Sequence, residues 1–254
     1  MPRYFIELSY RGSKYSGFQV QENAVTVQSE VEKAFAILHR RSVALTGSSR
    51  TDAGVHAFQN FFHFDDEEPV NVQFIYKMNA ILPDDIVIRN IYPVSQESHS
   101  RFDATSRAYI YKIHRFKDPF LKGLSCYYPY QLNLEAMEEA ASWVKEQNNF
   151  FAFCKTNTQV KNFNCTILKS EWEKDGRELY YNIEGNRFLR GMVRLLTATL
   201  LKVGRGKVGL EEFKTYFTEE KKCGFSVPAH GLYLNRVSYP ENYFPAMGGH
   251  FTVF

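Results

Sequence analysis

The sequence predicts an α+β fold in which one order of elements, β-α-β-β-α-β, occurs twice along 254 residues. Two observations carry this prediction. Short segments in which apolar and polar residues alternate, as in strands, are separated by longer segments whose apolar residues recur at helical spacing. Residues that cap helices stand at the start of several of the helical segments. Hydrophobic residues make up 44% and charged residues 23% of the chain, which is typical of a folded globular protein.

The first half of the chain is expected to contain four strands and two helices. The strands are expected over residues 3–10, 43–46, 58–64 and 86–92. Thr26 is placed to cap a helix that runs to about Arg40. The apolar face of this helix consists of Val27, Val31, Ala34, Phe35 and Leu38. Asn71 is placed to cap a second helix, which runs to about Leu82 and ends before Pro83.

The second half repeats this order with one additional helix. Its strands are expected over residues 107–115, 165–174, 178–184 and 232–238, and its helices over about 133–147, 187–203 and 210–217. The middle two strands form a hairpin turned at Asp175-Gly176, and Gly204 is expected to end the long helix. The inward face of the helix after Asn133 consists of Met137, Ala140, Ala141 and Val144.

The repeated order is that of a ferredoxin-like, or split βαβ, unit. We therefore expect two such halves, residues 1–104 and 105–254, whose sheets meet at a central cleft. No window approaches the roughly 18 consecutive apolar residues of a membrane span, and the N-terminus lacks the apolar region of a signal peptide. A cytoplasmic protein without a membrane partner is expected.

The cysteines and the net charge say little about the function of the protein. The cysteines are Cys126, Cys154, Cys165 and Cys223. They show neither CxxC nor Cys/His spacing, so we expect reduced thiols and no metal site. The net charge of +3 neither requires nor excludes a nucleic-acid partner, because local patches decide that question.

The most informative segment is residues 50–57, which read RTDAGVHA. Arg50 supplies a planar, permanently charged fork suited to phosphate or a nucleobase edge. Gly54 permits a backbone conformation that a side chain would penalise, and so lets the chain approach a ligand closely. The spacing alone is equally compatible with an ordinary turn in which Thr51 and Asp52 bond to local backbone.

The whole string closely resembles the catalytic motif of the TruA-type tRNA pseudouridine synthases, in which the aspartate is the nucleophile. Further segments resemble that family in the same order and extend over most of the chain. They are residues 10–19 (YRGSKYSGFQ), 99–109 (HSRFDATSRAY), 186–194 (NRFLRGMVR) and 231–234 (GLYL). The sequence departs from the family pattern at Arg11, where an acidic residue is usual, and at Ser49, where a glycine is usual.

The resemblance assigns roles to individual residues. It implies that Asp52 is the nucleophile and that Arg194 pairs with its carboxylate. Tyr109 is implied to stack on the target base and Leu232 to line the base pocket, and Arg50 is a candidate to occupy the space that a flipped base leaves. From the residues alone, a strand aromatic packed on a sheet is the favoured interpretation of Tyr109.

Other residues are candidates for binding the substrate. Lys14 and Tyr15 lie in the segment that resembles the family's RNA-contact loop. Arg187 and Arg190 stand at helical spacing from Arg194, which would place all three on one face, although such a face is often merely solvated. Tyr111, two residues beyond Tyr109, competes with it for the stacking role because it points to the same face of the expected strand.

The resemblance implies a pseudouridine-synthase-type antiparallel sheet core and isomerisation of uridine to pseudouridine at tRNA positions 38, 39 and 40. It also implies that the enzyme uses no metal or organic cofactor and is a homodimer that binds the anticodon stem-loop across both subunits. Whether Asp52 attacks C6 of the base or C1′ of the ribose stays open. Two alternatives are a non-catalytic RNA-binding protein and a small-molecule acid/base enzyme using Asp52 and His56. We expect His56 instead to form a structural hydrogen bond in the turn.

Overall fold

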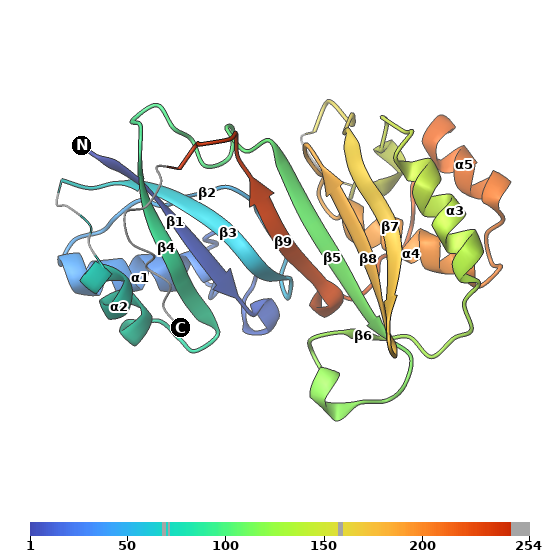
Figure 1. Cartoon of the computed structure of the whole chain (residues 1–254), viewed down its shortest axis with the longest axis horizontal. Coiled ribbons are helices and arrows are strands. Elements are labelled where there is room, and N and C mark those ends of the chain that lie inside the picture. Colours follow the sequence, from blue (N-terminus) through green and yellow to red (C-terminus); the bar gives the residue numbers. More distant parts are fainter. Residues whose placement is uncertain (68–69, 71, 157–159, 245–254) are drawn as a thin grey trace. The chain divides into compact units, whose positions relative to one another are not determined.

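The computed structural model describes residues 1–67, 70, 72–156 and 160–244. The chain divides into two compact units, whose elements are labelled in Figure 1. Unit 1 consists of Met1–Thr105 together with the chain from Leu234 onward, and unit 2 is Ser106–Tyr233. Both contain strands and helices, which confirms the α+β class. Residues 234–244 thus belong with unit 1.

Unit 1 is an antiparallel sheet with two α-helices beside it (Figure 1). Its elements are β1 (Arg3–Tyr10), η1 (Gly12–Lys14), α1 (Val27–His39), β2 (Thr46–Gly47), β3 (His56–Asp65), α2 (Val72–Ile81), β4 (Ile86–Val94) and most of β9 (Leu232–Ser238). The strand order is β4-β1-β3, and β2 also pairs with β3. The central strand β1 is therefore bonded on both sides.

Helix α1 begins where the sequence predicts. The Thr26 hydroxyl accepts the backbone N–H of Ser29 at 3.1 Å, and the Ser29 hydroxyl accepts the N–H of Thr26 at 3.0 Å. This reciprocal pair satisfies two backbone donors at the start of the helix. Of the expected apolar face, Leu38 is half-buried and the rest is buried. The core beneath is aromatic, and Phe18 stacks on Phe62 with ring centroids 4.5 Å apart.

The second expected strand of this unit is much shorter than predicted. Only Thr46–Gly47 pairs with β3, so the prediction of a strand over residues 43–46 is wrong for most of its length. Val43 and Leu45 are nevertheless buried. Alternation reports which side chains are buried, and these two are buried without ladder hydrogen bonds. Asn71, the expected cap of the second helix, lies outside the described residues.

Unit 2 consists of a set of mainly antiparallel strands with three α-helices beside them (Figure 1). Its elements are β5 (Ser106–His114), η2 (Pro119–Leu121), β6 (Cys126–Tyr127), α3 (Leu134–Val144), η3 (Phe151–Phe153), β7 (Ile167–Asp175), β8 (Glu178–Gly185), α4 (Met192–Gly204), α5 (Leu210–Thr218) and η4 (Ala229–Gly231). The strand order is β5-β8-β7, and the short β6 runs parallel to β5. Helix α3 contacts α4 and β7.

The predicted cap and inward face of α3 are confirmed, and the predicted hairpin turn is displaced by one residue. The Asn133 side chain caps α3 by accepting the N–H of Ala136 at 3.1 Å. The residues expected on the inward face of α3 are fully buried. The β7–β8 ladder pairs Asp175 with Glu178, so the turn is Gly176-Arg177, one residue later than predicted. Gly176 takes a φ of +55°, the conformation that makes glycine favourable at this position.

The long helix ends one residue later than predicted, and the left-handed glycine that follows it is Gly206, not Gly204. Gly204 is the last residue of α4, and Gly206 adopts the left-handed conformation with a φ of +65°. The N–H of Gly206 bonds to the Val203 carbonyl at 2.8 Å, and that of Lys207 to the Lys202 carbonyl at 2.9 Å, which together form a Schellman motif. Gly204 instead serves packing, because a Cβ there would lie 2.3 Å from the sulfur of Met137.

Two further findings concern membrane spans and the cysteines. No helix in the described part of the chain is long and apolar enough to cross a membrane. Cys126, Cys154, Cys165 and Cys223 are all free thiols in buried positions.

Candidate active site

The predicted nucleophile stands at the first position of a tight turn between β2 and β3. The N–H of Val55 bonds to the carbonyl of Asp52 at 3.1 Å. Gly54, the third residue of the turn, has a φ of +79°, which a type II turn requires and which glycine adopts most readily. The Asp52 side chain is half-buried, and Arg50 before it is exposed. The carboxylate of Asp52 is therefore partly accessible, and Arg50 is exposed to solvent.

The glycine-bearing segment after β1 packs directly on this turn. The N–H of Gly12 donates to Nδ1 of His56 at 3.1 Å, and the N–H of Phe18 donates to the carbonyl of Thr51 at 3.1 Å. Gly17, with a φ of +103°, passes so close that a Cβ would lie 3.0 Å from the same carbonyl oxygen. His56 is 1% exposed and accepts a backbone hydrogen bond, which confirms the structural role expected for it.

Lys14 and Tyr15 meet at one carboxylate. Nζ of Lys14 lies 3.0 Å from Asp85, and the buried Tyr15 donates its hydroxyl hydrogen to the same residue. Burial opposes the charge on Asp85, but the hydrogen bonds from these two neighbours outweigh it and lower the pKa of its carboxyl. Burial and the bond to Asp85 raise the pKa of Tyr15. The Tyr15 hydroxyl is thus committed within the fold, whereas the side chain of Lys14 is 80% exposed.

These residues border a small surface hollow of about 190 Å³. It is lined by Arg11, Ser13, Lys14, Asp84 and Asp85. Two cations and two carboxylates share it, so its charge is balanced. A phosphate placed there would compete with Asp85 for Lys14.

In unit 2, strand β5 presents the two tyrosines that compete for the stacking role. Tyr111 is fully buried, and its hydroxyl donates to the carbonyl of Pro228 at 2.9 Å. Tyr109 is half-buried, and its ring meets Phe188 edge to face with centroids 5.1 Å apart. Tyr111 is therefore a core residue, and Tyr109 is the tyrosine of the pair that keeps an accessible ring.

The segment that carries Arg187 and Arg190 is a non-helical lead into α4. The helix begins at Met192, because Gly191 before it takes a left-handed φ of +74°. The prediction of a helix from about residue 187 is wrong, and so is the inference that these arginines share a helix face with Arg194. Both lie in the exposed lead instead. The carbonyl of Arg190 is held by the N–H of Lys155 at 3.0 Å.

Arg194 lies in the first turn of α4 and is half-buried. Its Nε donates to the carbonyl of Val227 at 2.8 Å, and the N–H of Val227 bonds back to the Arg194 carbonyl at 3.3 Å. This paired contact fixes one edge of the guanidinium. Leu232, the first residue of β9, is 6% exposed.

A second hollow, of about 500 Å³, was not predicted. Its lining residues are Asn148, Asn162, Asn164, Cys165, Thr166, Asn186 and Arg187. Burial raises the pKa of the Cys165 thiol to about 11, although the nearby Arg187 acts against this rise. The thiol is accordingly protonated at neutral pH. Asparagines close together in sequence were the signal that could have indicated this hollow.

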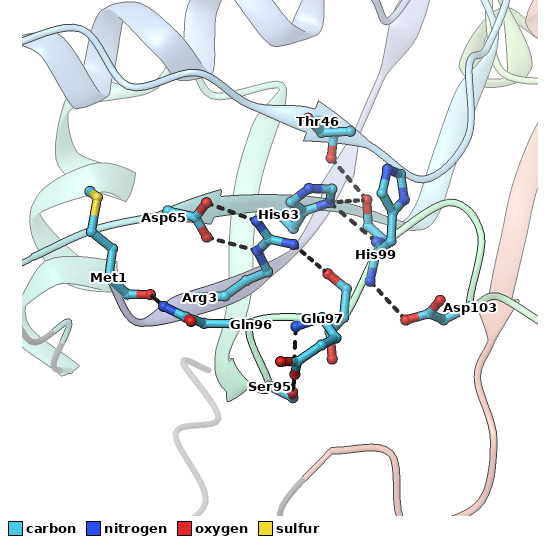
Figure 2. Close-up of polar contacts among 12 residues, drawn as sticks. Met1, Arg3, Thr46, His63, Asp65, Ser95, Gln96, Glu97, His99 and Asp103 are labelled. Carbon is cyan, nitrogen blue, oxygen red and sulfur yellow. Dashed lines mark hydrogen bonds and ion pairs between the residues drawn. The ribbon is translucent and has the colours of Figure 1, made fainter.

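A polar cluster in unit 1 ties the start of the chain to residues 98–103 (Figure 2). Arg3 makes a bidentate contact with Asp65, in which Nε and Nη2 donate to the two carboxylate oxygens at 2.7 and 2.8 Å. Nη1 of Arg3 donates to the carbonyl of Ser98 at 2.9 Å. The hydrogen bonds to Arg3 lower the pKa of Asp65. The exposed residues Arg101 and Phe102 follow this anchored point.

The same cluster contains a serine beside a histidine, a combination that hydrolases use for nucleophilic catalysis. Here the hydroxyl oxygen of Ser100 lies 2.9 Å from Nδ1 of His63 and also 2.9 Å from the carbonyl oxygen of Thr46. The backbone N–H of Ser100 lies 3.2 Å from the same Nδ1 (Figure 2). Ser100 is fully buried. The pair therefore connects segments of the fold, and its fully buried serine is not accessible to a substrate.

Comparison with known proteins covers nearly the whole chain. The family described as tRNA pseudouridine synthase matches residues 147–240. The tRNA pseudouridine synthase A of Parabacteroides distasonis is 45% identical over 249 residues, which are 96% of this chain and 99% of that protein. The protein of the same name from Porphyromonas gingivalis is 40% identical over 96% of this chain and 100% of its own length. The one from Staphylococcus aureus is 38% identical over 94% and 92%, respectively.

Identity at this level over nearly the full length extends well beyond the short segments that carry the predicted site. It covers both units, and the matched family region includes α4 and β9. The chain therefore belongs to the tRNA pseudouridine synthase A family.

Proposed function

We propose that this enzyme, a tRNA pseudouridine synthase and thus an isomerase, converts uridine to pseudouridine at positions 38, 39 and 40 of the anticodon stem-loop, with Asp52 as nucleophile. The observation that carries the proposal is the turn at residues 52–55. It presents a half-buried carboxylate on a backbone that is held by its own hydrogen bond and by a glycine conformation. A nucleophile needs both accessibility and a fixed direction.

The target uridine must leave the helical stack before a side chain can reach it. Extruding a base costs a few kcal/mol, which contacts with the flipped nucleotide and with the vacated space can offset. Arg50 is exposed and two residues from the nucleophile, so we assign it to the vacated space. Its guanidinium can stack on neighbouring bases and bond to phosphate at the same time.

The reaction exchanges one glycosidic bond for another without changing the composition of the nucleoside. The C1′–N1 bond breaks, a C1′–C5 bond forms, N1 gains a proton and C5 loses one. An ionised carboxylate divides this exchange into easier steps by forming a covalent adduct, at C6 of the base or at C1′ of the ribose. Aspartate is suited to either path because its ordinary pKa lies near 4.

Residues of unit 2 complete the proposed site. We assign Arg194 to the Asp52 carboxylate, since a neighbouring cation favours the ionised form. Its bond to the Val227 carbonyl would orient the guanidinium for that contact. Tyr109 would stack on the detached uracil while it rotates, and Leu232 would form the apolar wall. This assignment takes each unit as a ferredoxin-like half, for which the antiparallel orders β4-β1-β3-β2 and β5-β8-β7 are the support. That the two halves form a cleft is part of the proposal.

Binding of tRNA is assigned to exposed cations. Lys14, Arg187 and Arg190 would contact phosphates, and the buried Tyr15 would contribute by holding Asp85 and so the base of the Lys14 loop. Contacts of this kind position the RNA and leave the choice of base to the pocket. We further propose a cytoplasmic homodimer that grips one tRNA across both subunits and needs neither metal nor organic cofactor.

The site specificity can be tested with purified protein and tRNA transcripts. Three transcripts, each with uridine at only one of the positions 38, 39 and 40, are incubated with the enzyme, and pseudouridine is mapped at every remaining uridine. The proposal expects product at each of the three positions and at no uridine outside the anticodon arm. Product elsewhere in the tRNA would refute the assigned positions. A protein that binds these transcripts without forming any product would support the non-catalytic alternative.

A further inference from the structure

A fully buried amide lies behind the loop that leads to Asp52. Asn60 on β3 is 0% exposed, and its side chain makes four hydrogen bonds. Its Oδ1 accepts the Ser48 hydroxyl at 2.8 Å and the N–H of Phe61 at 2.9 Å. Its Nδ2 donates to the Ser49 carbonyl at 3.0 Å and to the Tyr10 hydroxyl at 3.2 Å. Both acceptor sites and both donors of the amide are thereby used.

The Tyr10 hydroxyl extends this connection to the residue before the nucleophile. It lies 2.9 Å from the hydroxyl of Thr51, and both residues are buried, at 4% and 8% exposed. Because the Tyr10 oxygen accepts a hydrogen bond from Asn60, its own hydrogen is available for Thr51. Asn60 and Tyr10 thus bond to three of the four loop residues 48–51 from the side of the sheet, namely Ser48, Ser49 and Thr51.

These side chains take over where the backbone ladder stops. Strand β2 ends at Gly47, and the N–H of Ser48 makes a further backbone bond to the Phe61 carbonyl at 2.8 Å. Beyond it, the loop no longer runs as a strand beside β3. A buried amide costs free energy unless all its polar atoms are paired, and a fully paired one holds its partners in a single arrangement. The amide of Asn60 meets this condition.

Resting on the proposed function, we infer that Asn60, acting through Tyr10 and Thr51, is a positioning residue that sets the direction of the Asp52 carboxylate. The hydrogen bonds anchor the loop residues that come directly before the turn at residues 52–55. Displacement of a reacting group by about 1 Å can lower a rate about 100-fold, so a loop held this way matters for the chemical step. Binding of tRNA does not depend on it.

Single hydroxyl deletions test this inference without opening a cavity. Tyr10→Phe and Thr51→Val each break the bond between these two residues while keeping the shape of the side chain. Each should lower the single-turnover rate at saturating tRNA by about 10-fold, the effect expected when the barrier rises by the worth of one buried hydrogen bond. The Kd for tRNA should change less than twofold. Thr51→Ser keeps the hydroxyl and should recover most of the rate that Thr51→Val loses.

The double variant separates positioning from direct action of Thr51 on the RNA. Tyr10→Phe removes the bond to Thr51 together with the acceptor of Asn60, whereas Thr51→Val removes only the bond to Tyr10. The double variant should therefore be no slower than Tyr10→Phe alone. If Thr51 acted on the substrate directly, the two losses would multiply, and the inference would be overturned. A rate within twofold of wild type in Tyr10→Phe would overturn it as well.

Tyr181→Phe is the matched control for lost stability. Tyr181 is a fully buried tyrosine whose hydroxyl lies 2.8 Å from the Ser170 hydroxyl in unit 2, so the same type of bond is broken outside the Asp52 loop. It should lower the midpoint of thermal unfolding about as much as Tyr10→Phe while leaving the rate unchanged. If Tyr10→Phe and Tyr181→Phe lost the same amount of rate, Tyr10 would contribute only to the stability of the fold, and the inference would be overturned. Failure of the wild-type enzyme to form pseudouridine, or full activity of Asp52→Asn, would instead refute the proposed function.

Discussion

A methyl group placed on Gly12 would lie 1.9 Å from the carbonyl oxygen of Val55. The glycine segment after β1 and the turn that carries Asp52 therefore touch backbone to backbone. No side chain can be accommodated at this point by rotation, because the neighbouring atom belongs to the main chain. This segment resembles a known RNA-contact segment. Its Gly12 is also required for packing, because a Cβ would collide with the Val55 carbonyl, and this requirement does not involve RNA.

Gly12→Ala should consequently damage both stability and activity. The two segments must separate to admit the methyl group, and overpacking of this kind costs about 1–3 kcal/mol. Gly224→Ala is the control, because its Cβ would meet nothing within 4 Å, and it should change the free energy of unfolding by less than about 0.5 kcal/mol. Urea denaturation of both variants gives the comparison. A Gly12→Ala protein as stable as wild type would contradict the close approach.

Arg194→Ala should lower the single-turnover rate about 100-fold, the loss typical for removing one group that stabilises charge at a reacting centre. Stability should fall by only about 1 kcal/mol, for the lost bond to the Val227 carbonyl. A fully buried ion pair would lose about 3–5 kcal/mol, but Arg194 is half-buried. Arg194→Lys keeps the charge without the planar fork and should be intermediate. A fully active Arg194→Ala protein would place this residue outside the catalytic machinery.

Much of the fold could be predicted because its signals are local. Thr26 and Asn133 each cap a helix by bonding to a residue three positions further along the chain. The strand predicted over residues 232–238 has the same bounds as β9. The start of α4 could not be predicted this way. The apolar and basic residues before Gly191 fit a helix, and only the left-handed backbone of that glycine shows where the helix begins.

In the candidate site, too, residues of a local motif could be predicted, whereas residues that meet only in the folded chain could not. Asp52 and Arg50 stand in a short motif, so the sequence sufficed to select them. The partners that hold the loop could not be found, because Asn60 reads as one residue of a strand, and its bonds to Tyr10 and Ser49 depend on how β1, β3 and the loop pack. Likewise, Tyr15 and Asp85 are 70 residues apart, and nothing in either neighbourhood indicates that they meet.

Stability should depend on pH through His63. Burial lowers the pKa of this imidazole from 6.5 to about 4 in the folded protein. The unfolded chain therefore takes up a proton between about pH 6.5 and pH 4 that the folded protein does not, so stability is lost as the pH falls through this window. From pH 7 to pH 5 the loss due to His63 should be roughly 2 kcal/mol. Burial also lowers the pKa values of His99 and His230, which act in the same direction.

The measurement is the free energy of unfolding in urea at pH 7 and pH 5, for wild type and His63→Gln. Glutamine can still accept the N–H of Ser100 but does not titrate, so the variant should lose markedly less stability over this interval. Equal losses in the two proteins would show that His63 does not titrate as described.

Affinity for tRNA should fall steeply as salt rises, because each cation that neutralises a phosphate releases counterions. Arg187→Ala and Arg190→Ala should each weaken binding and reduce the slope of log affinity against log salt by about 1. Lys169→Ala is the control, since this half-exposed lysine on β7 pairs with Glu171 at 2.6 Å and is assigned no contact with RNA. A wild-type affinity that is insensitive to salt would contradict the assignment of these cations to the RNA.

The central claim is that Asp52 is the nucleophile, and Asp52→Asn tests it most directly. The carboxamide keeps the size and polarity of the side chain but is too weak a nucleophile to form the covalent adduct. Wild type and variant are compared for tRNA binding and, separately, for pseudouridine at each uridine of the anticodon arm. The account predicts that Asp52→Asn binds tRNA at least as tightly as wild type, because a negative charge near RNA is lost, and forms no pseudouridine. Pseudouridine formation by Asp52→Asn at the wild-type rate would contradict the account.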